Sequence, residues 1–255
     1  VEAQDDSQPP DQPPEFVRHY PTIGAAAIEA QQVPLYRLWL ACRWLDQVGR
    51  GWVSLDDIKT DLTAGGRLPL CSWRHIRRLV SHGEGLYWTA AGDGLYLFGA
   101  AKVAANVVGG RLQGAAVALP LSVLASIGEF RAHLYAAVHS GRREANPITR
   151  GRQRELYGVP ERTQRHYCQV AGIERRRNIA IGGKLDEVSR QEAASERGRA
   201  WFAFRDHNGR NGQPGGEYNA WQLPSTHIGP HECLPVGRKR KINAKIGDLV
   251  NNGTQ

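Results

Sequence analysis

Hydrophobic residues recur at helical spacing from Val33 onward, and LYRLWLACRWLDQV reads as an amphipathic helix that ends near Gly49. A short strand and a second helix follow, in which Ser54 and Asp57 have the spacing of a capping box. SWRHIRRLVSHG gives a third helix with Ser72 as its N-cap, and two apolar strands then flank AAGDG as a hairpin with Asp93-Gly94 at its tip. The order of helix, strand, two helices and hairpin predicts a winged helix-turn-helix module.

The same plan returns after a connector rich in Ala, Gly and Val. Helices are predicted in EFRAHLYAAVHSG, in ITRGRQRELYG with Thr149 as its N-cap, and in VPERTQRHYCQVAG with Pro160 at its first position. ERRRNIAIGG begins the second wing. The strands WFAFRD and YNAWQLP form a long hairpin, which belongs either to this wing or to a small extra sheet.

We therefore predict an α+β, helix-rich fold with two winged helix-turn-helix modules and a small C-terminal β-hairpin extension. Its N-terminal leader is acidic and proline-rich, and we expect it to be disordered. The predicted parts are the leader (1–22), the first module (23–108), a connector (109–120), the second module (121–183) and an extension with a basic segment (184–255).

Charge points to a polyanionic partner. The 33 Lys and Arg residues exceed the 25 Asp and Glu residues, which gives a net charge of +8, and the isoelectric point is about 9.6. Four scattered cysteines without a C-x-x-C pair do not form a disulfide framework, so we expect a reducing compartment, the cytoplasm. No apolar run reaches the roughly 18 residues that a membrane span requires, and we expect no membrane partner.

The third helix of each module is the candidate reading helix, because this helix enters the major groove in helix-turn-helix proteins. In the second module we place Tyr167, Val170 and Ala171 toward the core and Cys168 outward. Arginine pairs well with guanine, and glutamine with adenine. The predicted base-reading residues of the two helices are Arg74, His75, Arg77, Arg78, Arg162, Gln164, Arg165 and His166.

A second set of cations is expected to contact phosphates, which position a protein on DNA without reading sequence. Only four glutamates oppose ten arginines between residues 142 and 178, so internal ion pairing cannot neutralise this stretch. For the later GRKRK run, a solvated tail and a recruitment motif are the alternatives. The predicted phosphate-binding residues are Arg150, Arg152, Arg154, Arg175, Arg176, Arg177, Arg238, Lys239 and Arg240.

GVPERTQRHY and YNAWQLPSTH resemble segments of the tandem winged-helix replication initiators of plasmids, prophages and integrative elements. In that family the second phrase usually has asparagine where Ser225 stands. The resemblance covers roughly residues 33–183 and is mainly one of architecture. It implies sequence-specific binding of double-stranded DNA at repeated origin sites, with replication proteins and a second copy of the chain as further partners.

Other functions stay open. A transcriptional regulator would use the same chemistry at promoter operators, and winged helices also serve as protein-interaction modules. His227, His231 and Cys233 have a spacing that suits a metal, as in a metal-dependent nuclease, but no second pair of ligands accompanies them. No phosphate-binding loop or nucleophile motif is present. We expect a binding protein that is not an enzyme and that needs neither cofactor nor metal.

Overall fold

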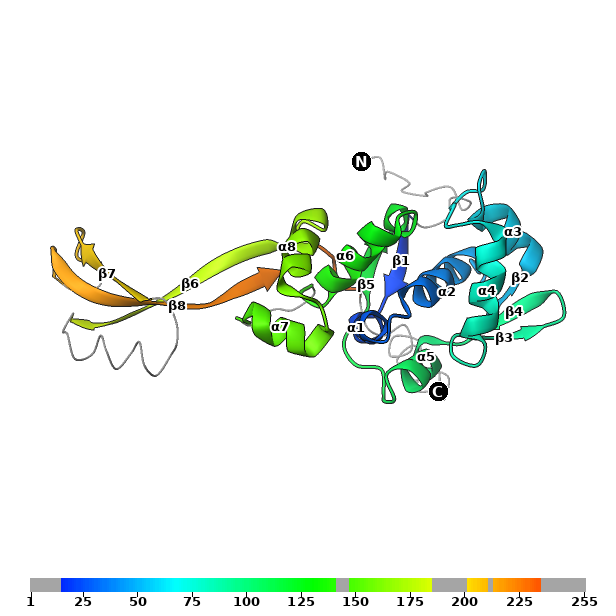
Figure 1. Cartoon of the computed structure of the whole chain (residues 1–255), viewed down its shortest axis with the longest axis horizontal. Helices are drawn as coiled ribbons and strands as arrows, with labels where there is room; N and C mark the ends of the chain where they lie inside the picture. The colour runs from blue at the N-terminus through cyan, green and yellow to red at the C-terminus, as the bar shows by residue number, and fades with distance from the viewer. Residues whose placement is uncertain (1–14, 141–146, 185–200, 211–212, 235–255) are drawn as a thin grey trace, which may run out of the picture.

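The computed structural model describes residues 15–140, 147–184, 201–210 and 213–234. Helices and small antiparallel sheets form an elongated body, and a long β-sheet extends from one end of it (Figure 1). The predicted mixture of helices and strands is confirmed. The two parts that resemble each other in element order lie one after the other along the long axis.

The first helical unit runs from α2 to β4 in the predicted order. Its middle helix begins as expected, because Ser54 Oγ accepts a hydrogen bond from the Asp57 backbone N–H at 2.9 Å. Ser72 also occupies the predicted N-cap position, although its side chain makes no capping hydrogen bond. The elements are α2 (Val33–Leu45), β2 (Trp52–Ser54), α3 (Leu55–Leu62), α4 (Trp73–Gly83), β3 (Trp88–Ala91) and β4 (Gly94–Leu97), with the strands in the order β2-β4-β3.

The hairpin tip lies one residue earlier than predicted. Ala91 pairs with Gly94, so Gly92 and Asp93 form the two-residue turn. Gly92 has a φ of +59°, a conformation that glycine adopts without the steric cost of a side chain. Gly94 is instead the first residue of β4, where an added Cβ would meet the Trp52 ring at 2.6 Å.

Part of the predicted leader is ordered, so the expectation of disorder through residue 22 is wrong for its last residues. β1 (Phe16–His19) pairs antiparallel with β5 (Val117–Pro120), and α1 (Pro21–Glu29) follows it. Val17 and His19 point into the core while Phe16 is 43% exposed, which is the two-residue alternation of a strand. The predicted connector likewise ends in β5 instead of linking two separate bodies; α5 (Ala100–Val107) and the 3-10 helix η1 (Leu121–Leu124) lie on either side of it in the chain.

The second helical unit consists of α6, α7 and α8 and the strands that follow them. Thr149 caps α7 as predicted, with its Oγ1 accepting from the Arg152 N–H at 3.2 Å. The strands pair in the order β6-β8-β7 and form the long sheet of Figure 1, which we call the arm. The elements are α6 (Ile127–Ala137), α7 (Arg150–Tyr157), α8 (Glu161–Val170), β6 (Glu174–Lys184), β7 (Trp201–Asp206) and β8 (Gly216–Ile228).

The two units share one connection that the sequence did not predict. In the first unit, β2 pairs with β4 immediately before α3 begins. In the second, the Ile148 N–H donates to the Ser225 carbonyl of β8 at 3.1 Å, two residues before α7 begins. In both units the segment that enters the second helix therefore hydrogen-bonds to the last strand of the hairpin. The strands that the sequence places in either the second wing or an extra sheet, β7 and β8, lie in the same three-stranded sheet as β6, the strand that directly follows α8.

The chain returns from the arm into the body. The Ala118 N–H donates to the Glu232 carbonyl at 3.0 Å, and the Leu234 N–H donates to the Ala116 carbonyl at 2.8 Å. These bonds place residues 232–234 beside β5, on a small sheet that also contains β1. The arm is thereby attached to the body through β6, which follows α8, and through the segment that follows β8.

One hydrophobic core extends across the first unit and into the second. The Tyr36 ring lies against Trp39 and Tyr87, and it also contacts Phe130 of α6 at a centroid distance of 6.3 Å. Phe130 and Leu134 are fully buried in this core, whereas Tyr135 on another side of α6 belongs to a smaller cluster with α8. Helix α6 therefore packs against both units.

Candidate nucleic-acid interface

Helix α4 presents cations to solvent over an apolar base. Ile76 and Leu79 are buried, and Arg74, Arg77 and Arg78 are exposed, as the sequence predicts. None of the ion pairs within the described ranges involves these three arginines. Within the part of the chain that the structure describes, no carboxylate therefore neutralises these three side chains.

His75 is less available than predicted. Its side chain is half-buried beside a cavity that Arg37 and Leu79 also line, and its Nδ1 lies 3.3 Å from Arg78 Nη2. Because the guanidinium can only donate, His75 accepts this bond and orients Arg78. In this structure His75 therefore positions the Arg78 side chain at the surface of α4.

Helix α8 carries the second candidate set. Arg162, Arg165 and His166 are exposed, and Gln169 is exposed with them. Residues spaced by three and four positions share one face of a helix, so these four belong to the same surface. The sequence reading omitted Gln169, although its spacing from Arg165 and His166 would have indicated it.

Gln164 does not lie on that face, which corrects the prediction that it reads bases. It is fully buried, and its Nε2 donates to the Arg150 carbonyl at 3.0 Å and to the Val159 carbonyl at 2.8 Å. Its spacing from Tyr167 and Ala171 places it on the inner stripe of α8. Gln164 therefore joins α8 to the start of α7 and to the loop between them.

Two further placements on α8 also differ from the prediction. Val170, expected in the core, is 37% exposed, and Cys168, expected outside, packs against the smaller core cluster. Both follow from the same helical phase that buries Gln164. Tyr167 and Ala171 pack inward as predicted.

The predicted phosphate-binding residues fall into three groups. Arg154 and Arg177 are exposed on α7 and β6. Arg152 and Arg176 are also exposed but have carboxylate partners, Glu155 and Glu174, each at 2.8 Å. Such exposed pairs add little stability and open readily toward a competing anion. Arg238, Lys239 and Arg240 lie outside the described residues.

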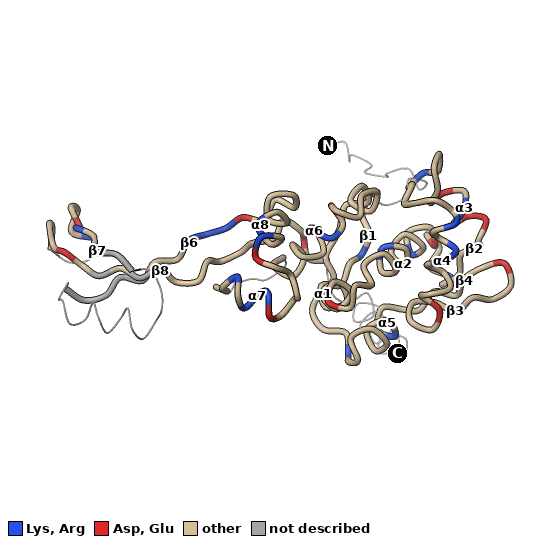
Figure 2. The backbone as a smooth tube through the Cα atoms, viewed as in Figure 1, with Lys and Arg blue, Asp and Glu red and all other residues tan. Residues whose placement is uncertain are grey.

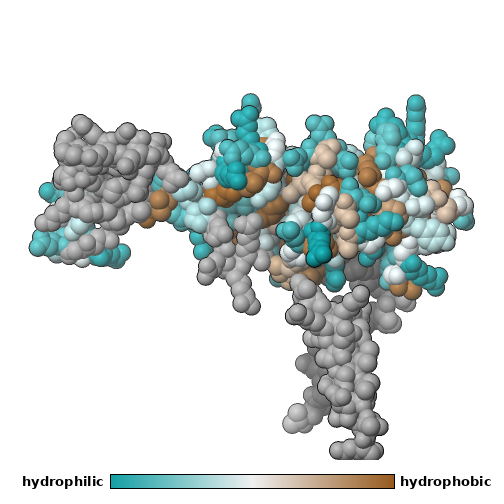
Figure 3. All heavy atoms as spheres, turned by 90° about the horizontal axis from the view of Figure 1, so that it is seen from below, coloured by the Kyte–Doolittle hydropathy of each residue, from teal (hydrophilic) through white to brown (hydrophobic). Residues whose placement is uncertain are grey.

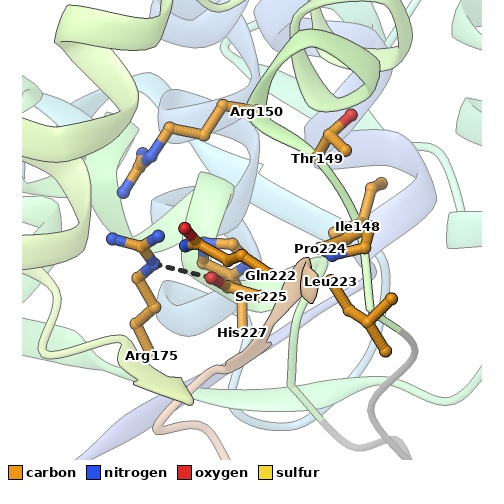
Figure 4. A pocket seen from close by; sticks show the side chains of 9 residues that line it. All are labelled: Ile148, Thr149, Arg150, Arg175, Gln222, Leu223, Pro224, Ser225 and His227. Carbon is orange, nitrogen blue, oxygen red and sulfur yellow. Dashed lines mark hydrogen bonds between the residues drawn. The ribbon is translucent and has the colours of Figure 1, made fainter. Parts of the chain in front are cut away.

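The third group, Arg150 and Arg175, lines a pocket of about 230 Å³ where the start of α7 meets the base of the arm. The two guanidinium groups point toward one another, one from α7 and one from β6 (Figure 4). Arg175 Nε donates to Ser225 Oγ at 2.9 Å, while Arg150 Nη1 is buried without a partner among the described residues. The nine residues that line this pocket include no carboxylate.

His227 lies in the wall of the same pocket and is 3% exposed. The Tyr135 hydroxyl donates to Gln153 Oε1, and Gln153 Nε2 donates to His227 Nδ1 at 3.2 Å. Burial, and then the neighbouring charges of Arg150 and Arg175, lower the pKa of His227 to about 4. The ring is therefore neutral near pH 7, and because Nδ1 accepts, its proton is on Nε2.

The residues considered for a metal are far from forming one site. His227 interacts with Gln153, whereas His231 lies 3.3 Å from His133 Nδ1 and donates its backbone N–H to Ser140 Oγ. Within the described ranges, no group of three or more His, Cys, Asp or Glu side chains is placed to hold a metal ion. The four cysteines are free thiols.

Cations gather where the second unit meets the arm. Figure 2 shows lysine and arginine along α7, on α8 and at the start of β6, next to few acidic positions. The face drawn in Figure 3 is mainly hydrophilic, with hydrophobic side chains exposed between polar ones.

Comparison with models of known families, with curated proteins and with solved structures found no match for this chain. Among the helices that the structure describes, none has the length and apolar character needed to cross a bilayer.

Proposed function

We propose that this chain is a sequence-specific, double-stranded DNA-binding protein with two winged helix-turn-helix modules. The observation that carries the proposal is a repeated one. Two units, each with three helices followed by antiparallel strands, place exposed arginines on their third helix that form no ion pair within the described ranges: Arg74, Arg77 and Arg78 in α4, and Arg162 and Arg165 in α8. In a helix-turn-helix protein this is the surface that enters the major groove.

The two candidate reading helices support binding to an extended site. α4 lies toward one end of the body and α8 lies next to the arm, with α6, β1 and α2 between them along the long axis (Figure 1). Two such helices on one rigid core would contact separate segments of a duplex. Phosphate contacts from Arg154 and Arg177 would fix the register.

The first test is a titration of the full chain against random duplex DNA between about 50 and 200 mM salt. We expect affinity to fall steeply with salt, because each phosphate contact releases counterions. The triple variant Arg74→Ala, Arg77→Ala, Arg78→Ala should bind more weakly, while Arg111→Ala, an exposed arginine outside both units, should bind as the parent does. No binding at the lowest salt would rule out the proposal.

Base reading is tested separately on a duplex selected from a random library. Arg165→Ala should weaken the free energy of binding to the selected site by about 1–3 kcal/mol, and that of binding to random duplex by much less. Arg154→Ala should reduce the affinity for both duplexes equally, since a phosphate contact does not depend on sequence. Equal losses for Arg165→Ala on the two duplexes would assign Arg165 to phosphate contact.

We further propose that the DNA target is a replication origin of a plasmid, prophage or integrative element. The support is the resemblance of GVPERTQRHY, which here forms the loop before α8 and most of that helix. An initiator requires its selected site as several repeats in the DNA that carries its own coding sequence. A single occurrence within a promoter would instead favour a transcriptional regulator.

A further inference from the structure

The pocket between α7 and the arm combines positive charge with unsatisfied donors. Within the described ranges, no ion pair involves Arg150 or Arg175, although their guanidinium groups face each other (Figure 4). Two like charges held close together raise the energy of the empty pocket unless an anion lies between them. The usual compensation by a buried carboxylate is missing from the lining.

His227 supplies an independent reason to expect a ligand. Its Nδ1 is occupied by Gln153, and Gln153 is in turn oriented by Tyr135, so the donor must be Nε2. This Nε2 is buried and has no hydrogen-bond partner among the described residues. A buried donor without an acceptor costs about 1–3 kcal/mol, and an acceptor atom from a ligand would remove that cost.

We propose that this pocket is a built binding site for one phosphate group, held by Arg150, Arg175 and His227 at the N-terminal end of α7. The inference rests on the proposed DNA-binding function only for the source of the phosphate. The first-turn N–H groups of a helix and its dipole favour an anion at this position. Arg150 begins α7, and Thr149 in the same pocket caps it.

The location favours a phosphate of the DNA backbone. The pocket adjoins the helix that precedes the candidate reading helix, and Gln164 of that reading helix hydrogen-bonds to the Arg150 carbonyl. A phosphate bound here would therefore fix the position of α8 on a duplex. A free phosphate or the phosphate of a nucleotide would satisfy the same donors, and the experiment has to separate these sources.

The first measurement is the thermal unfolding of the full chain in inorganic phosphate and in chloride at equal ionic strength. We expect saturating phosphate to raise the Tm by about 2–4 °C, because a ligand that binds only the folded state stabilises it. Arg150→Gln with Arg175→Gln should abolish this rise. The matched control, Arg50→Gln with Arg111→Gln, removes the same charge at two exposed positions outside α7, α8 and the arm, and it should keep the rise.

The variant is expected to fold, since both substituted side chains reach solvent and their mutual repulsion is removed. Its Tm in chloride should equal or exceed that of the parent. An equal phosphate effect in parent, variant and control would overturn the site, and so would the absence of any effect in the parent.

The second measurement identifies the source of the bound phosphate through the salt dependence of duplex binding. If the phosphate belongs to DNA, the slope of log affinity against log salt should fall by about 0.9 in the Arg150→Gln, Arg175→Gln variant. An unchanged slope together with a lost phosphate effect would assign the pocket to a free phosphate or nucleotide. If the parent binds no duplex at all, the proposed function fails. The thermal unfolding measurement still shows whether the pocket binds phosphate.

Discussion

At the scale of single residues, the position of a polar side chain on its helix decides its role more than its chemistry does. Glutamine suits adenine, and Gln164 lies between two exposed arginines in sequence. Helical spacing nevertheless aligns it with Tyr167 and Ala171, and the structure buries it. Its Nε2 donates to the carbonyls of Val159 and of Arg150, the latter 14 residues away, and no local pattern reveals that second partner.

Gln164→Ala should destabilise the fold by about 1–3 kcal/mol, because the carbonyls of Arg150 and Val159 lose their donor. Urea unfolding measures the change. Gln169→Ala, at an exposed position of the same helix, should stay within about 0.5 kcal/mol of the parent. A variant at Gln164 that keeps its stability but loses preference for the selected DNA site would restore the base-reading assignment.

Buried histidines should make the fold sensitive to mild acid. Burial is the main cause that lowers the pKa of His19 to about 3 and the pKa values of His227 and His231 to about 4. Each is depressed below the ordinary value of 6.5, so the unfolded chain binds more protons at intermediate pH. The stability from these neutral rings is complete above about pH 6.5 and is lost as the pH falls toward about 4.

The urea midpoint should accordingly decrease between pH 6.5 and 5.5, before the Asp and Glu side chains of the unfolded chain protonate to any large extent. His231→Gln should make the decrease shallower, and His82→Gln, at an exposed position, should leave it unchanged. A midpoint that is constant over this range would show that the histidines titrate alike in both states.

At the scale of elements, the predictable parts are those whose signals are local. The Ser54 and Asp57 cap, the apolar stripe of α4 and the Thr149 cap each lie within a few residues of the helix they define, and each is found. β1 was missed because it has four residues and pairs with β5, about a hundred residues further along the chain. Such a strand has no local signal beyond the alternation of Val17 and His19.

Positive charge is concentrated where the arm begins, and the stretch of sequence that follows is balanced in charge. Arg175, Arg176 and Arg177 lie where β6 begins, on the side near α8. Residues 180–221 carry as many acidic as basic residues: Lys184, Arg190, Arg197, Arg199, Arg205 and Arg210 against Asp186, Glu187, Glu192, Glu196, Asp206 and Glu217. The charges of this stretch of sequence therefore add no net attraction to a polyanion.

Replacing residues 180–221 with Asn-Gly should leave both stability and duplex affinity nearly unchanged. Ile179 and Gln222 are direct partners in the ladder, so a two-residue turn can close the shortened hairpin. Urea unfolding and the salt-dependent titration measure the two properties. Arg177→Ala is the contrasting change at the base, and it should reduce the salt slope by about 1. A marked loss of affinity in the shortened chain would place DNA contacts on the outer arm.

At the scale of the whole molecule, the two groups of three helices followed by strands were predictable, but the way in which they assemble was not. The hydrophobic pattern indicated two units joined by a connector. In the structure the end of that connector instead forms strand β5, and residues 232–234 lie beside this strand. Hydrophobic spacing reports which face of a helix is buried, and it does not report that α6 buries two faces against different partners.

This shared core predicts that both units unfold together. Phe130 is fully buried, and it contacts the aromatic group of Tyr36 from α6. Phe130→Ala should cost about 3–5 kcal/mol and should lower the midpoints seen by tryptophan fluorescence and by far-ultraviolet circular dichroism equally. Phe16→Ala, at a residue that is 43% exposed, should change both much less. Two separated transitions, with only one displaced by Phe130→Ala, would mean that the units are independent. The candidate reading helices α4 and α8 would then have no fixed spacing imposed by this core.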